Sequence, residues 1–339
     1  MKKIDIRWAV AIVLVLSLSL FPLFLKRYPY WMLVISYAFF YAILSSSWAL
    51  LAGIAGQFSF AHVAFVGIAA YTSGLLGKYF NVPPAAGIFA GTLMAGLMGL
   101  FIGFLCLRLR GAYLALFTIA FSEIVRLVVL SEYKITEGHN GLPMKPLFAG
   151  LTPEAQSLVQ YYLTLAMLVG SMAFMYWLAG SRFGLFIKAM REDEQAAASM
   201  GVDIVRYKVL IFAITSVIIG MAGSIFYHQL GIVAPQNMDL LQMSLIIAFA
   251  VIGGIESLLG AAIGAFLARL SLEWLRDVHI LGLHFKPGVW RYAAFGILLM
   301  LTLRFARNGL IYPFIDRFFL RRAREEAVRK RRQVKEVKA

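Results

Sequence analysis

The stretch Ala85–Leu107 gives the clearest indication of the fold class, and it reads AAGIFAGTLMAGLMGLFIGFLCL. It contains no charged residue, and roughly 20 apolar residues in helical form are enough to cross the hydrocarbon core of a bilayer. Small residues recur at every fourth position on one face of the expected helix, at Gly91, Ala95, Gly99 and Gly103. Small residues at this spacing let helix backbones approach closely in lipid. The stretch therefore predicts a transmembrane helix that packs tightly against its neighbours.

The whole chain has the composition of a multi-pass membrane protein. Of its 339 residues, 61% are hydrophobic and 14% are charged, against about 25% charged in an ordinary soluble domain. This excludes a disordered chain, a coiled coil and an ordinary cytosolic enzyme. We expect an all-α fold with about ten transmembrane helices, within a range of eight to eleven. The ten apolar blocks are Trp8–Leu25, Trp31–Ala52, Phe60–Leu76, Ala85–Leu107, Ala112–Leu130, Leu158–Gly180, Val209–Tyr227, Leu241–Ile255, Leu258–Leu275 and Trp290–Leu303.

Basic residues predict which side of the membrane each loop faces. The net charge is +15, from 32 Lys and Arg against 17 Asp and Glu. With ten spans and a cytoplasmic N-terminus, 22 of the 32 basic residues fall in cytoplasmic segments, as the positive-inside rule requires. Both termini are therefore expected in the cytoplasm. The charge excess indicates contact with anionic lipid rather than nucleic acid. Residues 1–310 form the expected transmembrane domain, and residues 311–339 form a basic tail, either bound to the membrane surface or solvated.

Motifs of soluble enzymes are absent from the sequence. No Gly-x-x-x-x-Gly-Lys-Ser/Thr phosphate loop and no His-Glu-x-x-His zinc helix occurs. The single cysteine, Cys106, excludes a disulfide framework and a cysteine metal site. We therefore expect no catalytic residue, no metal and no cofactor on this chain.

Polar side chains inside or beside the apolar blocks are candidates for a translocation path, because ionisable groups in spans are functional candidates by default. The first group lies in the Gly-rich stretch Leu51–His62, which is either a cytoplasmic hairpin or a broken helix near the substrate path. In the fifth block, Glu123 and Arg126 are spaced i, i+3 and form either a structural ion pair or a substrate contact. The loop Thr136–Pro143 is either a connector or a docking surface. The candidate residues are Gln57, Ser59, His62, Thr118, Ser122 and Glu123.

The long loop Ser181–Lys208 between two spans predicts a short helix. Acidic residues at its expected start favour the helix dipole, and they are Glu192, Asp193 and Glu194. Ala196–Ala198 are strong helix formers with little bulk, and Gly201 is a suitable C-terminal stop. Because so short a helix is marginal alone, we expect it to dock on a partner.

The same loop resembles a known motif. The run Gln195, Ala196, Ala197 and Gly201 is similar to the Glu-Ala-Ala-x-x-x-Gly coupling loop of bacterial ABC-importer permeases, with Gln195 in place of glutamate. The motif's later Ile-x-Leu-Pro is kept only at Ile211. Further segments resemble the branched-chain amino acid permease family of the LivM type over about residues 36–310. They are Gly53–His62, Leu107–Arg126, Thr136–Leu142, Gly253–Gly260 and Phe305–Leu310.

The resemblance implies a permease subunit of a binding-protein-dependent importer in the bacterial inner membrane. Its implied partners are a homologous LivH-type permease, two cytoplasmic ABC ATPases and a periplasmic binding protein that delivers leucine, isoleucine or valine. ATP would be used by the ATPases, with Glu192–Gly201 as the contact that transmits its hydrolysis. Urea, amides or other amino acids are alternative substrates.

Two other classes of protein remain open. A proton-coupled secondary transporter needs a titratable relay, and Glu123 is the only clearly mid-span carboxylate besides Glu273, which we expect at the interface. A structural membrane scaffold would not need the docking helix.

Overall fold

The computed structural model describes residues 17–22, 29–148, 150–275, 289–305 and 309–310. Residues 17–22 are helical, but most of the expected first span, Trp8–Leu25, lies outside the described residues. The basic tail, residues 311–339, lies outside them as well.

Nine of the ten predicted apolar blocks coincide with helices. These are α2 (Pro29–Trp48), α3 (His62–Tyr79), α4 (Pro84–Leu105), α5 (Ala112–Ser131), α7 (Pro153–Gly180), α10 (Ile204–Leu230), α11 (Leu240–Gly253), α12 (Leu258–Trp274) and α13 (Val289–Phe305). Short elements connect them, namely the π-helix η1 (Ala49–Ile54), η2 (Cys106–Arg108), α6 (Tyr133–Thr136), η3 (Gly138–Asn140), β1 (Leu142–Pro143), α8 (Arg182–Glu192), α9 (Glu194–Ser199), β2 (Ile232–Val233) and η4 (Pro235–Met238). The expected all-α, multi-pass architecture is confirmed.

Several of these helices are long and apolar enough to cross a membrane. Within the described residues there are five, or six if α11 and α12 are taken as one broken span bent by 118°. The five are Tyr30–Ile54, Pro84–Arg108, Ala112–Ser131, Glu154–Gly180 and Ile204–Leu230. The apolar helices α3 and α13 pack beside them and are not in this count.

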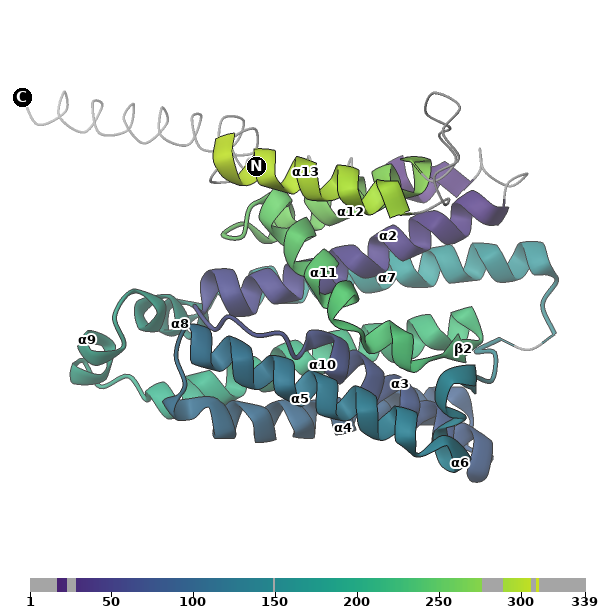
Figure 1. Ribbon diagram of the computed structural model, residues 1–339, viewed down its shortest axis with the longest axis horizontal. Coiled ribbons are helices and arrows are strands. Elements are labelled where there is room, and N and C mark those ends of the chain that lie inside the picture. The colour runs from purple at the N-terminus through teal and green to yellow at the C-terminus, as the bar shows by residue number, and fades with distance from the viewer. Residues whose placement is uncertain (1–16, 23–28, 149, 276–288, 306–308, 311–339) are drawn as a thin grey trace, which may run out of the picture.

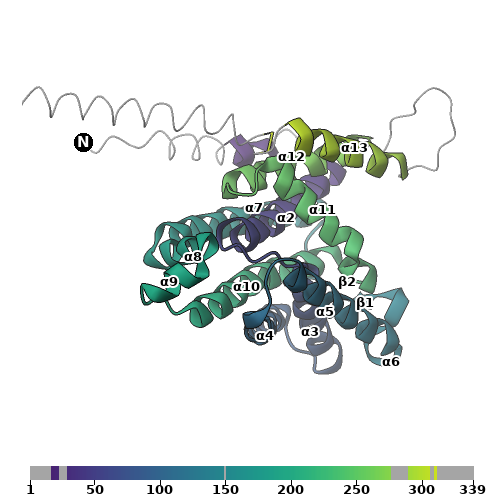
Figure 2. The ribbon, with the colours of Figure 1, turned by 60° about the vertical axis from the view of Figure 1, so that its left-hand side comes forward.

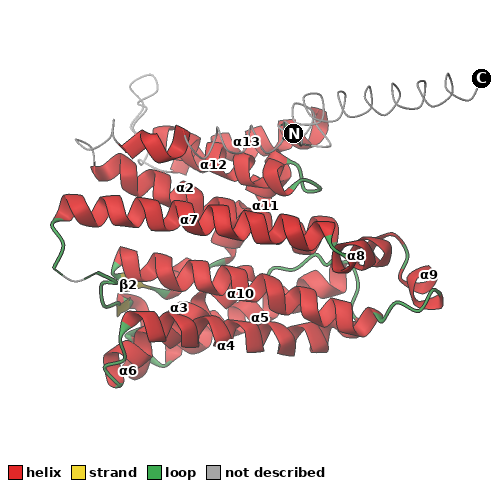
Figure 3. Ribbon diagram, turned by 180° about the vertical axis from the view of Figure 1, so that it is seen from behind, coloured by secondary structure: helices red, strands yellow, loops and turns green. Residues whose placement is uncertain are grey.

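The helices form two packed layers. Helices α2, α7, α12 and α13 make one layer, and α3, α4, α5 and α10 make the other, while α11 crosses between them (Figure 1). Seen from behind, α7 and α10 run side by side along the length of the molecule (Figure 3). The hydrophobic core is continuous from one layer to the other, because side chains of α2 pack on α10 and α11.

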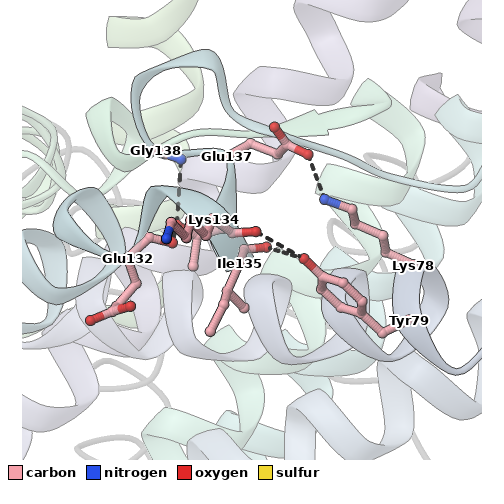
Figure 4. Close-up of polar contacts among 8 residues, drawn as sticks. Lys78, Tyr79, Glu132, Lys134, Ile135, Glu137 and Gly138 are labelled. Carbon is pink, nitrogen blue, oxygen red and sulfur yellow. Dashed lines mark hydrogen bonds and ion pairs between the residues drawn. The ribbon is translucent and has the colours of Figure 1, made fainter.

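The two ends of the bundle differ. Helices α8 and α9 project from one end, and the β1–β2 pair with α6 covers the other (Figure 2). The strands are antiparallel, with Leu142 opposite Val233. On this second end, Lys78 forms an ion pair with Glu137, and the Tyr79 hydroxyl donates to a carbonyl oxygen of α6, as Figure 4 shows. The Thr136–Pro143 loop is therefore held on the end of α3.

Small residues bring α4 close to its neighbours, as predicted. A Cβ added at Gly99 would lie 2.0 Å from the Ser216 Oγ of α10. One added at Gly91 would lie 2.2 Å from the Ala69 carbonyl oxygen of α3. The bare face of α4 is thus filled by two helix backbones, and the prediction of tight packing is confirmed.

Candidate coupling site

The loop between α7 and α10 folds into two helices rather than one. The break falls at Asp193, whose backbone is extended and whose Oδ1 accepts hydrogen bonds from the backbone N–H groups of Gln195 and Ala196, at 2.8 and 3.0 Å. An aspartate in this position satisfies the free donors at a helix start. Glu192 was expected at the start of the short helix, but it is the last residue of α8. That expectation is wrong because Asp193, and not Glu192, caps α9.

Gly201 ends α9 as the sequence predicts. Its φ is +84°, a left-handed conformation that side chains with a Cβ disfavour. The N–H of Val202 donates to the Ala197 carbonyl at 3.1 Å, and the N–H of Gly201 donates to the Ala198 carbonyl at 2.9 Å. This pair of hydrogen bonds is a Schellman motif, which satisfies the last carbonyls of the helix.

The exposed face of α9 is not the one that the alanine run suggested. Ala197 lies within the expected contact Glu192–Gly201, but it is only 6% exposed. Its small side chain packs against its own chain, so it is not part of the exposed face of α9. Ala196 and Ala198 are exposed, and Met200 is 85% exposed. A partner would therefore meet Ala196, Ala198 and Met200.

Glu194 holds α9 against the bundle. Its carboxylate forms ion pairs with Lys208 Nζ of α10 and with Arg110 Nη2, each at 2.5 Å. The Glu194 side chain is 15% exposed and that of Lys208 is 3% exposed, whereas that of Arg110 is 65% exposed. The Glu194–Lys208 pair is thus largely desolvated, and removal of one partner would leave a buried charge. Glu194 therefore links α9 to α10 and to the connection between α4 and α5.

Arg191 attaches α8 to the bundle, as Glu194 attaches α9. Its Nη1 donates to the Gly53 carbonyl oxygen at 2.6 Å, and its Nη2 pairs with Glu256 at 2.5 Å. Gly53 lies in η1, and Glu256 lies in the bend between α11 and α12. A cavity of about 470 Å³ opens here, between residues 55–57, residues 110–111 and residues 190–195.

Four of the predicted path residues come together where α2 is interrupted. Between η1 and α3 the chain is non-helical, and Gln57, Ser59 and His62 are all buried. The Ser59 carbonyl accepts from the Trp48 indole N–H at 2.8 Å, and the backbone N–H of Phe60 donates to Thr118 Oγ1 at 2.9 Å. Irregular backbone at membrane depth needs such internal partners. The contacts favour a broken helix over an exposed hairpin.

The remaining path candidates lie elsewhere on α5. Ser122 is buried in the bundle, while the Glu123 side chain is 42% exposed and pairs with Arg126. The ion pair expected from the i, i+3 spacing is confirmed. The six candidates therefore do not share one environment, because Glu123 is partly exposed while the other five are buried.

The sequence interpretation missed several charged partners. Arg110 and Lys208 were counted only as cytoplasmic charge, although both bind Glu194. Arg269 was not singled out, and Glu273 was expected at the interface. The structure buries Glu273, which is 6% exposed, and pairs it with Arg269 at 3.0 Å. The sequence did contain a signal for this pair, because Arg269 and Glu273 are opposite charges spaced i, i+4 within an apolar block. In the part of the chain that the structure describes, no cluster of three His, Cys, Asp or Glu side chains is placed to hold a metal ion.

Two layers of apolar helices, with a charged helix pair attached at one end, define a multi-pass helical membrane protein. Residues 31–303 match the family described as "Branched-chain amino acid transport system / permease component". The match covers more than half of the chain, and the chain belongs to this family of transport permeases.

Named relatives extend this comparison. The chain is 31% identical over 266 residues to the high-affinity branched-chain amino acid transport system permease protein LivM of Escherichia coli, covering 70% of this chain and 61% of LivM. It is 26% identical over 230 residues to the probable branched-chain amino acid transport permease protein LivM of Methanocaldococcus jannaschii, covering 65% of this chain and 66% of that protein. The xylose transport system permease protein XylH of Escherichia coli is 28% identical over 145 residues, covering 41% of this chain and 34% of XylH.

Proposed function

We propose that the chain is a permease subunit of a binding-protein-dependent ABC importer and that it translocates branched-chain amino acids. The family supports a transport role. The LivM relatives match more of the chain, and the E. coli protein does so at a higher identity, than the xylose permease XylH. They favour leucine, isoleucine and valine over a sugar. Urea, amides and other amino acids remain the alternative substrates.

One observation carries the proposal of ATP coupling, namely the attachment of the α8–α9 pair. Its exposed outer face consists of small or flexible side chains. On its inner face, Glu194 and Arg191 bind four separate parts of the bundle. A helix pair built in this way transmits the movement of an external subunit to the membrane helices. A connector with no partner would have no need of two buried or half-buried ion pairs.

The proposed assembly follows from this role. The partners are a LivH-type permease, two ABC ATPases that bind α9 from the cytoplasm, and a periplasmic binding protein at the end that carries β1 and β2. The proposed location is the bacterial inner membrane with both termini in the cytoplasm. The chain itself would hydrolyse nothing.

The test is ATP-dependent uptake by the purified transporter in proteoliposomes. We expect leucine, isoleucine and valine to be accumulated when ATP and the binding protein are present, and a protonophore to leave uptake unchanged. Uptake that collapses with the protonophore and ignores ATP would identify a secondary transporter. The absence of both uptake and a co-purifying ATPase would identify a scaffold. Preferential uptake of urea or xylose would overturn the proposed substrate class but not the assignment as an ABC importer.

The coupling contact is tested by Ala196→Arg, which places a long charged side chain on the exposed face of α9. We expect ATPase binding or uptake to be lost, while insertion and thermal stability are retained. The matched control is Ala196→Ser, which leaves the same exposed position without added bulk or charge. Uptake at the wild-type rate in the Ala196→Arg variant would show that the loop only connects α7 to α10 and does not bind the ATPase.

A further inference from the structure

A cavity of about 170 Å³ lies between the two helix layers. From one layer it is lined by α2, α12 and α13, and from the other by α3 and α10, while α11 and η4 close one side. Its lining includes Asn237 of η4, which follows β2 directly, and Val63 at the start of α3 (Figure 1 shows these elements). The cavity is separate from the coupling site, with which it shares no lining residue.

The lining of the cavity includes the charged side chain Arg269. The guanidinium lies 5.4 Å from the ring centre of Tyr37 and 5.9 Å from that of Tyr41, and its Nη1 donates to Glu273 at 3.0 Å. In the described chain, Glu273 is the one acceptor that the guanidinium bonds, and a guanidinium carries five N–H donors. The fork of donors that remains matches the two oxygens of a carboxylate.

Neutral polar groups stand beside the guanidinium. The Tyr41 hydroxyl donates to Gln242 Oε1 at 2.5 Å, and Asn237 also lines the cavity. Their amide oxygens, the tyrosine hydroxyls and the aromatic faces suit an ammonium group. Arg269 is already neutralised by Glu273, so the site favours a zwitterion, which has one positive group, one negative group and no net charge.

Aliphatic side chains also line the cavity, and they are Leu44, Val63, Val66, Leu245 and Ile246. Cavities of about 150 Å³ accommodate a benzene-sized group, and the side chain of leucine is smaller than benzene. The volume therefore suits a short branched aliphatic side chain, and the head group would lie against the polar lining.

We propose that this cavity within a single subunit is a binding site for the zwitterion of a small aliphatic α-amino acid, with the carboxylate on Arg269 and the side chain among Val63, Leu245 and Ile246. The proposal rests on the proposed function, because it assigns a site to the same class of substrate. It adds that the subunit itself selects its cargo by size and by the carboxylate. Closure of the two helix layers on the ligand would bury its head group.

The competing explanation is a structural ion pair. Arg269 and Glu273 are one turn apart on α12, and Tyr30 also donates to Glu273. A purely structural pair explains the burial of both charges, but it gives no reason for the neighbouring space, which both polar and aliphatic side chains line. The two explanations differ in whether the cavity changes ligand selectivity.

The experiment uses the transporter purified with its co-purifying subunits in lipid nanodiscs, without the binding protein. Tritiated leucine is bound and is then displaced by valine, alanine or leucinamide, which lacks the carboxylate. Leu245→Phe adds bulk among the aliphatic side chains of the lining, and Arg269→Lys keeps the charge opposite Glu273 but removes the fork. Leu93→Phe, on the exposed face of α4, is the matched control for added bulk.

We expect wild-type binding in which leucinamide competes poorly. Leu245→Phe should weaken leucine binding about tenfold relative to alanine, since one or two methylenes in an apolar site change affinity by that order. Arg269→Lys should remove the discrimination between leucine and leucinamide, and Leu93→Phe should behave as wild type. If Arg269→Lys fails to fold, the side-chain selectivity of Leu245→Phe still decides the matter.

Two results would overturn the site while leaving the transporter assignment intact. One is wild-type ATP-dependent leucine uptake combined with unchanged selectivity in Leu245→Phe. The other is such uptake with no detectable leucine binding in nanodiscs. If the wild type accumulates no amino acid at all, the proposed function fails, and this inference fails with it.

Discussion

Glu194→Gln tests the attachment of α9 to the membrane helices. The substitution keeps the size and shape of the side chain but removes the charge that Lys208 and Arg110 share. Lys208 is left as a charge that is 3% exposed with no counter-ion from Glu194. We expect α9 to detach from α10 more often, and the coupling of ATP hydrolysis to uptake to weaken.

The magnitude follows from the burial of the two partners. Breaking a buried ion pair by removing one member costs about 3–5 kcal/mol. Because Glu194 keeps some exposure, about 3 kcal/mol is appropriate for its pair with Lys208. The exposed Arg110 adds about 0–1 kcal/mol. A change of about 3 kcal/mol raises the detached population roughly a hundredfold.

Hydrogen exchange measured by mass spectrometry over residues 194–202 reports this detachment directly. We expect exchange in Glu194→Gln to be roughly a hundredfold faster than in the wild type. The double variant Glu194→Gln/Lys208→Met should recover most of the protection, because no unpaired buried charge is left. Glu192→Gln is the control, since none of the ion pairs among the described residues includes Glu192. Equal protection in Glu194→Gln and Glu192→Gln would refute the reasoning.

Three further experiments test packing, pairing and helix termination. Gly99→Leu should lower thermal stability by about 1–3 kcal/mol because its Cβ would overlap α10. Gly170→Leu is the control and should not lower it, because Gly170 has open space around it. Equal melting temperatures for the two variants would contradict the close packing of α4 on α10. Glu123→Gln and Arg126→Gln should each reduce expression or stability, and the double change should be milder than their sum. Normal stability with lost uptake in Glu123→Gln would instead place this carboxylate on the translocation path. Gly201→Val should destabilise α9 by about 1–3 kcal/mol at its left-handed stop, seen as faster exchange of the α9 amides, and unchanged exchange would contradict it.

The sequence predicted the helices well because their signals are local. Apolar length, the small residues at Gly91 and Gly99, and the glycine stop at Gly201 each act within one helix or one turn. Glu192 was misplaced because the side chain that caps a helix depends on the backbone conformation at Asp193, which composition does not reveal. The orientation of Ala197 was missed because it depends on how α9 lies against the rest of the chain.

The polar site was harder to predict because its partners are far apart in the sequence. Glu194 binds Arg110 through a contact between distant loops, and the loop sequence alone gives no sign of it. The cavity beside Arg269 forms only when helices of both layers assemble. Only the i, i+4 spacing of Arg269 and Glu273 was visible in the sequence.

The most direct test of the central claim is a site-specific cross-link from α9. Cys106 is the single cysteine of the sequence, so Cys106→Ser gives a cysteine-free background. In this background Ala196→Cys lies on the exposed face of α9, and Ile232→Cys lies at the opposite end of the bundle. We predict that position 196 cross-links to an ATP-hydrolysing subunit with a yield that changes on addition of ATP, while position 232 does not. A transporter that is active in uptake but gives no cross-link to that subunit from position 196 would contradict the account.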